Sequence, residues 1–150
     1  MGRDSRRRPP PGIGVRSGAR RIGSRLSERI LLRVDATTGH VGVVRATATA
    51  LAARLDYTYD RITDLHIAID EVCGRILATS DPPATRFDVT FTVEPGALRV
   101  EIRGDGSLRS GADFLNPWSK MILEAIAEDL QLHDRNGAIL VSFQVAKGMA

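Results

Sequence analysis

The chain has 150 residues, of which 43% are hydrophobic and 26% are charged, with a formal net charge of +3. These values are ordinary for a soluble globular protein and allow one hydrophobic core. No apolar run approaches the roughly 18 residues that cross a bilayer, which excludes a membrane-spanning helix. The single cysteine, Cys73, cannot form an internal disulfide, so we expect a cytoplasmic protein with no membrane contact.

The positive charge is concentrated at the N-terminus. Residues 1–25 contain eight Arg and one Asp, which gives +7 and leaves −4 of the total +3 for residues 26–150. A domain with a net negative charge is poorly suited to binding nucleic acid, because phosphate binding needs clustered Lys and Arg on the folded surface. It suits a protein partner with a basic surface better.

The first 26 residues are rich in Arg, Pro and Gly and contain few large apolar side chains. This composition predicts a disordered tail (residues 1–26), followed by one domain over residues 27–150. Pro9–Gly12 follows the arginines at 6–8 in place of an apolar stretch, so we expect no twin-arginine export signal. Two interpretations of the tail stay open, a solubilising extension and an electrostatic handle for nucleic acid or an acidic protein.

The first half of the domain predicts a strand and two helices. Apolar residues within 29–34 indicate the strand, and Thr37 or Thr38 can cap a helix after it. Asp60 is the predicted cap of the second helix, and Pro82 and Pro83 follow its end. Both helices carry apolar residues at spacings of three and four, namely Val41, Val44, Ala48, Leu51 and Leu55 in the first and Ile62, Leu65, Ile69, Val72 and Ile76 in the second.

The second half predicts a hairpin, a loop, a third helix and a last strand. Apolar residues alternate over 87–93 and 98–102 on either side of a Pro-Gly turn, which is typical of an antiparallel pair. A loop over 103–115 leads to Asn116-Pro117, where Asn caps a helix and Pro fits its first turn. The inner side of this helix is predicted to be Trp118, Met121, Ile122, Ala125 and Ile126. After Asn136-Gly137, residues 139–145 form the last strand.

The order of these elements predicts an α/β fold, a two-layer sandwich with three helices on one face of a mainly antiparallel sheet. Combined with the segment Asp64–Cys73 (DLHIAIDEVC), it resembles the ATP-binding fold of gyrases and histidine kinases, and most closely the anti-sigma factors of the serine-kinase type. The stretch from Phe114 to Leu132, with Pro117-Trp118-Ser119 entering a helix and Glu128-Asp129 near its end, resembles the actinobacterial anti-sigma-F branch. The resemblance covers roughly residues 28–147.

The resemblance implies a nucleotide site beside the second helix. Glu71 matches the glutamate that acts as general base in active members, here interpreted as vestigial. The asparagine that holds Mg²⁺ one turn later is replaced by Arg75. Arginine has only donors and cannot ligate a cation, but it could contact a phosphate or form an i,i+4 ion pair with Glu71. The sequence therefore predicts no metal ligand at this position.

Two further motifs of the implied site are altered. In the family an Asp-x-Gly motif binds adenine, and the strand register places Gly104 at the Asp position and Gly106 at the Gly position. Asp105 is one residue away and could reach adenine only if a bulge turned it to the other face. A glycine-rich lid precedes the third helix in active members; here Ser119 and Lys120 are the remaining candidate phosphate contacts.

Other reactive residues support no separate site. Cys73 lies on an apolar stripe, which favours a buried thiol over a nucleophile. The three histidines His40, His66 and His133 share no metal-ligand spacing with Cys73 or with one another, so we predict no metal centre.

These observations favour an anti-sigma factor that sequesters an alternative sigma factor and is released by an anti-anti-sigma protein, with weak or absent ATP and Mg²⁺ binding. The resemblance also implies a homodimer that contacts through the first strand and first helix. One alternative is an active serine/threonine kinase that phosphorylates the anti-anti-sigma partner. A second is a nucleic-acid-binding module that uses the Arg-rich tail.

Overall fold

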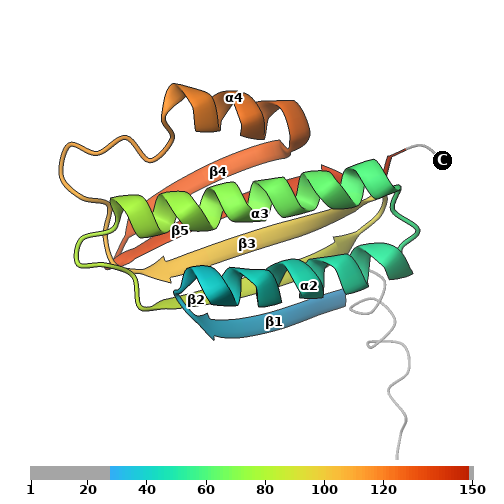
Figure 1. Cartoon of the computed structure of the whole chain (residues 1–150), viewed down its shortest axis with the longest axis horizontal. Helices are drawn as coiled ribbons and strands as arrows, with labels where there is room; N and C mark the ends of the chain where they lie inside the picture. The colour runs from blue at the N-terminus through green and yellow to red at the C-terminus, as the bar shows by residue number, and fades with distance from the viewer. Residues whose placement is uncertain (1–27, 149–150) are drawn as a thin grey trace, which may run out of the picture.

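The computed structural model describes residues 28–148 as one five-stranded antiparallel sheet covered on one face by three helices (Figure 1). This confirms the predicted two-layer α/β sandwich. The predicted disordered tail and the boundary at residue 26 lie outside the described residues. None of the three described helices has the length and apolar character that spanning a bilayer requires.

Five strands form the sheet in the order β1-β2-β3-β5-β4. The first three are β1 (Glu28–Asp35), β2 (Arg86–Glu94) and β3 (Ala97–Asp105), and the last two are β4 (Glu128–Arg135) and β5 (Ala138–Ala146). All neighbouring pairs are antiparallel. Strands β1 and β4 are the edge strands because they stand at the two ends of this order. Alternate residues of the central strands point to the helices and form the core, as the period of two predicts.

The largest fully buried side chains of the sheet are Phe87, Phe91, Phe143, Leu98, Ile102 and Ile139. Helices α2 (Thr38–Arg54) and α3 (Tyr59–Thr79) pack their apolar stripes on these side chains. Thr37 caps α2, one of the two predicted caps, and its side chain accepts a hydrogen bond from the His40 backbone N–H. The predicted cap of α3 was wrong. Thr58 accepts from the Arg61 backbone N–H, which places Asp60 inside the first turn, where its charge suits the helix dipole.

Helix α4 (Pro117–Ile126) begins as predicted, with the Asn116 side chain accepting from the Ser119 backbone N–H at 2.8 Å. The predicted inner side of this helix was wrong in three positions, since Trp118 is 65% exposed, Met121 is 56% exposed and Ala125 is exposed as well. The fully buried residues are Ser119 and Leu123. Helix α4 lies at the border of the helix layer (Figure 1), where Ser119 faces α3 and the large side chains of Trp118 and Met121 face solvent.

Strand β4 was not predicted, because the sequence analysis continued the third helix towards Leu132. The helix ends at Ile126 and the chain enters a strand at Glu128. This strand lies at the sheet edge and is largely exposed on both faces. Its residues 129–133 alternate between polar and apolar, which is a strand signal, but the alternation is short and the sequence analysis assigned this stretch to the helix.

Candidate nucleotide site

The Glu71 carboxylate lies between α3 and α4 and is half-buried. Its Oε1 accepts a hydrogen bond from the Ser119 hydroxyl, and Ser119 is fully buried. The same serine is held by the Asn116 cap at the start of α4. The carboxylate that the family resemblance assigns to the reaction therefore contacts the helix that follows the lid.

Arg75 lies one turn after Glu71 and points to the segment that precedes α4. Its Nε donates to the Phe114 carbonyl at 2.6 Å, and its Nη2 donates to the Asp113 carbonyl at 3.0 Å. The alternative ion pair with Glu71 is not among the ion pairs described for residues 28–148. Arg75 thus holds the segment before α4, here called the lid segment (residues 108–116), against α3. It does so from the position where the family pattern has a metal-ligating asparagine.

Gly104 and Gly106 are glycines for steric reasons. A Cβ at Gly104 would lie 2.5 Å from Ile76 Cγ2, so α3 leaves no room for a side chain at the position of the adenine-binding aspartate. Gly106 has φ +122°, and a Cβ there would lie 2.7 Å from the Pro82 carbonyl oxygen. Both positions support close packing of strand, loop and helix.

The Asp105 carboxylate points to the start of β2. Oδ1 accepts from the backbone N–H groups of Thr85 at 2.8 Å and Arg86 at 2.7 Å, and Oδ2 accepts from the Thr85 hydroxyl. Partial burial raises the pKa of Asp105, but these hydrogen bonds outweigh it and hold the pKa below its usual value. The strand pairing is regular here, with Asp105 opposite Ala138, so no bulge turns the carboxylate to the helix side. A contact with adenine stays a prediction that would require these bonds to break.

Lys120 is exposed, and its Nζ lies 4.0 Å from Glu124 Oε1, one turn along the same helix. Its predicted phosphate contact is untested. The sequence analysis did not foresee the bonds that close this region, from Ser119 to Glu71 and from Arg75 to two carbonyls. No local pattern indicates them, since the partners are 48, 39 and 38 residues apart.

These residues do not fit a metal–nucleotide complex as the family pattern would hold it. The metal-ligating amide is replaced by a cation, the adenine-binding carboxylate by a glycine under Ile76, and Glu71 is bonded to Ser119. Among residues 28–148, no group of three or more His, Cys, Asp or Glu side chains is placed to hold a metal ion.

Cys73 is fully buried on α3, and burial, with a smaller contribution from Asp70, raises the pKa of its thiol to about 12. We expect the thiol to be unreactive towards a disulfide reagent at pH 8 in the folded protein, because the thiolate fraction is then on the order of 10⁻⁴. In urea the same thiol should react fully, and the signal is unambiguous because the chain has one cysteine. A fast, complete reaction of the native protein would contradict the buried position.

Curated proteins similar to this chain include one called serine-protein kinase RsbW from Bacillus cereus (strain AH820). It is 36% identical over 111 residues, which are 73% of this chain and 68% of the relative. The protein of that name from Bacillus subtilis (strain 168) is 43% identical over 82 residues, 53% of this chain and 51% of the relative. The anti-sigma-F factor RsbW of Mycobacterium tuberculosis (strain H37Rv) is 29% identical over 106 residues, 69% of this chain and 61% of that protein.

The chain spans about half the length of several of the curated relatives it matches. No family model matches the chain. Among solved structures, the RsbU and RsbW domains of a Mycobacterium tuberculosis protein superpose with a TM-score of 0.61 at 16% identity, over 79% of this chain and 32% of that one. At this identity the superposition supports the fold.

Proposed function

This chain belongs to the RsbW family, and from that premise we propose that it is an anti-sigma factor that sequesters an alternative sigma factor in the cytoplasm. An anti-anti-sigma protein would release the sigma factor by competing for the same chain. By the family resemblance the active form would be a homodimer. Relatives are named both as serine-protein kinases and as an anti-sigma-F factor, and the second name describes the activity proposed here.

The closed contact between α3 and α4 is the observation that carries this proposal. The Ser119 hydroxyl donates a hydrogen bond to the Glu71 carboxylate. Arg75 donates to the carbonyls of Asp113 and Phe114, in the segment before α4 that would cover a nucleotide. Phosphoryl transfer depends on a positioned metal and on backbone contacts to phosphates. Binding a protein needs only a stable complementary surface. The described residues favour the second activity, with ATP and Mg²⁺ bound weakly or not at all.

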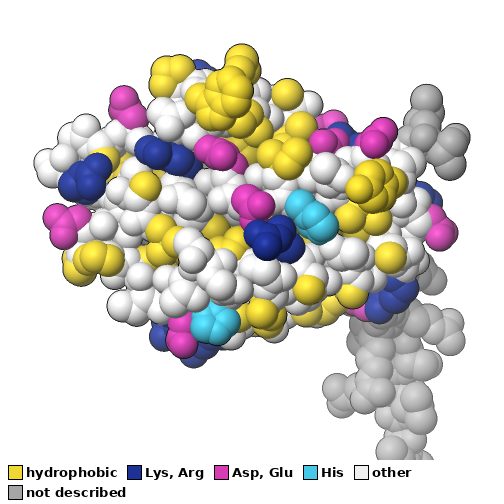
Figure 2. Space-filling view, viewed as in Figure 1, with side chains coloured by type: hydrophobic (Ala, Val, Ile, Leu, Met, Phe, Trp, Pro, Cys, Tyr) yellow, Lys and Arg dark blue, Asp and Glu magenta, His cyan; other side chains and the backbone are white. Residues whose placement is uncertain are grey.

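An exposed apolar surface lies on the helix layer. Trp118 and Met121 are neighbours on the outer side of α4, where hydrophobic side chains gather in the space-filling view (Figure 2). Large exposed apolar side chains, tryptophan above all, often dominate the binding energy of protein interfaces. We assign this surface to the sigma factor.

The test is binding of the full-length chain to each purified alternative sigma factor of its source organism, measured by biolayer interferometry. One sigma factor should bind, and Trp118→Ser with Met121→Ser should weaken binding at least tenfold, or about 1.4 kcal/mol. Lys120→Ser with Glu124→Ser is the matched control on the same helix and should change binding less than threefold. Failure of every sigma factor to bind would refute the function, whereas tight binding unaffected by the apolar pair would refute only the surface.

The kinase alternative is favoured by one observation, the presence of Glu71 at the position of the family's reactive glutamate. Incubation with Mg-ATP and the anti-anti-sigma partner, followed by intact-mass analysis, separates the two activities. Addition of one phosphoryl group to the partner, lost in Glu71→Ala, would establish the kinase. We expect the partner mass to stay unchanged.

A further inference from the structure

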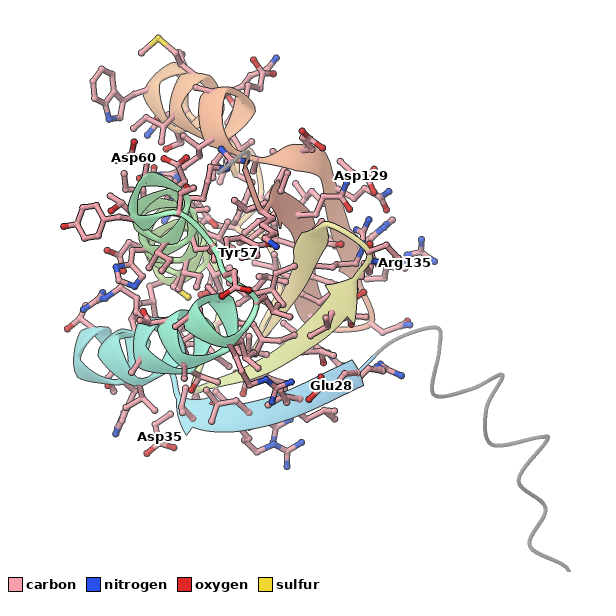
Figure 3. The ribbon with its side chains drawn as sticks, turned by 90° about the vertical axis from the view of Figure 1, so that its right-hand side faces the viewer. Glu28, Asp35, Tyr57, Asp60, Asp129 and Arg135 are labelled. Atoms are coloured by element: carbon pink, nitrogen blue, oxygen red, sulfur yellow. The ribbon has the colours of Figure 1, made fainter. Side chains whose placement is uncertain are left out.

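The outer face of the sheet, opposite the helices, carries a row of side chains across three strands. Leu140 of β5 lies between Arg103 of β3 and His133 of β4 in the strand register. Ala138 and Arg135 form the adjacent pair, two residues towards the β4–β5 turn. Figure 3 shows Arg135 on the side of the sheet away from the helices.

These five residues and Asn136 line a shallow hollow of about 410 Å³. The floor is apolar, with Ala138 buried and Leu140 half-buried, and the two arginines on its rim are exposed. The hollow lies on the other face of the sheet from Glu71 and Arg75, so it is separate from the site considered above.

The arginines of this hollow are free to bind an anion. Neither Arg103 nor Arg135 takes part in an ion pair described for residues 28–148, and Arg135 Nη2 lies 3.3 Å from His133 Nδ1. Asp88 is opposite Arg103 in the register, but it is paired with Arg33 at 2.6 Å and with Arg86 at 3.4 Å.

Two of the other carboxylates at this end of the sheet, those of Asp105 and Asp134, already accept hydrogen bonds. Asp105 accepts three hydrogen bonds from the start of β2, and Asp134 accepts from the Leu108 backbone N–H at 3.3 Å. Glu101 also faces outward, two residues before Arg103 on β3, and its cross-strand neighbours are Thr90 and Ser142. The residues that line the hollow therefore include two arginines and no carboxylate, and Glu101 lies outside the lining on the far side of Arg103 from Asp105. Residues 26–150 as a whole carry a net charge of −4.

We propose that this hollow binds an extended acidic segment of a partner protein, with one apolar side chain of the segment on Leu140 and flanking carboxylates on Arg103 and Arg135. Guanidinium groups match the planar, two-oxygen geometry of carboxylates. The apolar floor provides a contact for an aliphatic side chain, which a phosphate backbone lacks. Because residues 26–150 carry a net negative charge, the domain repels a long polyanion such as nucleic acid more strongly than it repels a short acidic peptide.

The test uses the full-length chain and a fluorescent peptide, Asp-Glu-Leu-Asp-Glu, followed by anisotropy at low and physiological salt. Arg103→Gln with Arg135→Gln should weaken binding roughly fivefold to tenfold, as expected for two partly exposed charge pairs. Arg29→Gln with Arg109→Gln removes the same charge from exposed positions outside the hollow and is the matched control. It should change binding less than twofold, and both variants retain the eight N-terminal arginines.

Two further measurements separate the apolar contact of the peptide from its charge contacts, and peptide binding from nucleic-acid binding. Exchanging the peptide leucine for glycine should weaken binding to the parent chain, and this difference should disappear in Leu140→Ser, which removes the apolar floor. A single-stranded oligonucleotide should bind both arginine variants equally. Equal loss of peptide binding in the two variants, no loss in either, or selective loss of oligonucleotide binding in the Arg103/Arg135 variant would overturn the proposal. None of these outcomes depends on binding of a sigma factor.

Discussion

Replacing Gly104 with aspartate is expected to lower the free energy of unfolding by about 3 kcal/mol or more, and not to create an adenine acceptor. A Cβ at this position meets Ile76 Cγ2 at 2.5 Å, and Ile76 is fully buried between α3 and the sheet. The added atoms would overpack the core, and the carboxylate would lose water without gaining a partner. Urea denaturation followed by circular dichroism measures the loss.

Two alanine variants separate overpacking from the charge. Gly104→Ala should still cost about 1–3 kcal/mol, because the Cβ alone makes the clash. Gly74→Ala on the exposed side of α3 is the matched control. A Cβ there has no neighbour within 4 Å, so the variant should gain about 0.5–1 kcal/mol from helix propensity. If Gly104→Asp were as stable as the parent chain, the close packing of β3 under α3 would be refuted.

Replacing Arg75 with asparagine is expected to cost about 1.5–3 kcal/mol and to loosen the segment before α4. The guanidinium donates to the carbonyls of Phe114 and Asp113, and the shorter amide cannot reach both. Hydrogen bonds from a charged donor are worth more than neutral ones, and the Phe114 carbonyl would lose its described side-chain donor. Urea denaturation measures the cost, and hydrogen exchange over residues 108–120 should increase.

Arg109→Asn is the matched control for this prediction. Arg109 is exposed on the same loop, and the one hydrogen bond of its guanidinium within residues 28–148 is a 3.4 Å contact with the Ala78 carbonyl. Its replacement should change the free energy of unfolding by less than about 0.5 kcal/mol. Equal effects of the two substitutions, or unchanged exchange in Arg75→Asn, would show that Arg75 does not hold the lid segment.

Much of the fold could be predicted because its signals are local. The strict alternation of β2 and β3, the apolar stripes of α2 and α3 and the Asn-Pro start of α4 are each contained in a short window. Strand β4 was missed, since it is an edge strand paired only with β5 and its short alternation, with Leu130 and Leu132 between polar residues, follows directly on the helix. The exposure of Trp118 depends on where α4 lies against α3, which no periodicity specifies.

The sequence predicted on which helix the candidate site residues lie, but not which groups their side chains contact. The segment that resembles the family's second helix placed Glu71 and Arg75 one turn apart, and the structure has them on α3 as expected. What each side chain contacts depends on residues of the lid segment and α4, nearly 40 or more positions later. The steric requirement at Gly104 likewise comes from Ile76 of another element.

Calorimetric titration of the full-length chain with ATP and Mg²⁺ tests most directly whether its own side chains have closed the nucleotide site. With Glu71 bonded to Ser119 and Arg75 to the lid segment, we predict no binding tighter than about 100 µM, which corresponds to about 5.5 kcal/mol. A stoichiometric, magnesium-dependent transition with a dissociation constant well below this value would contradict that closure and make the kinase activity the better assignment.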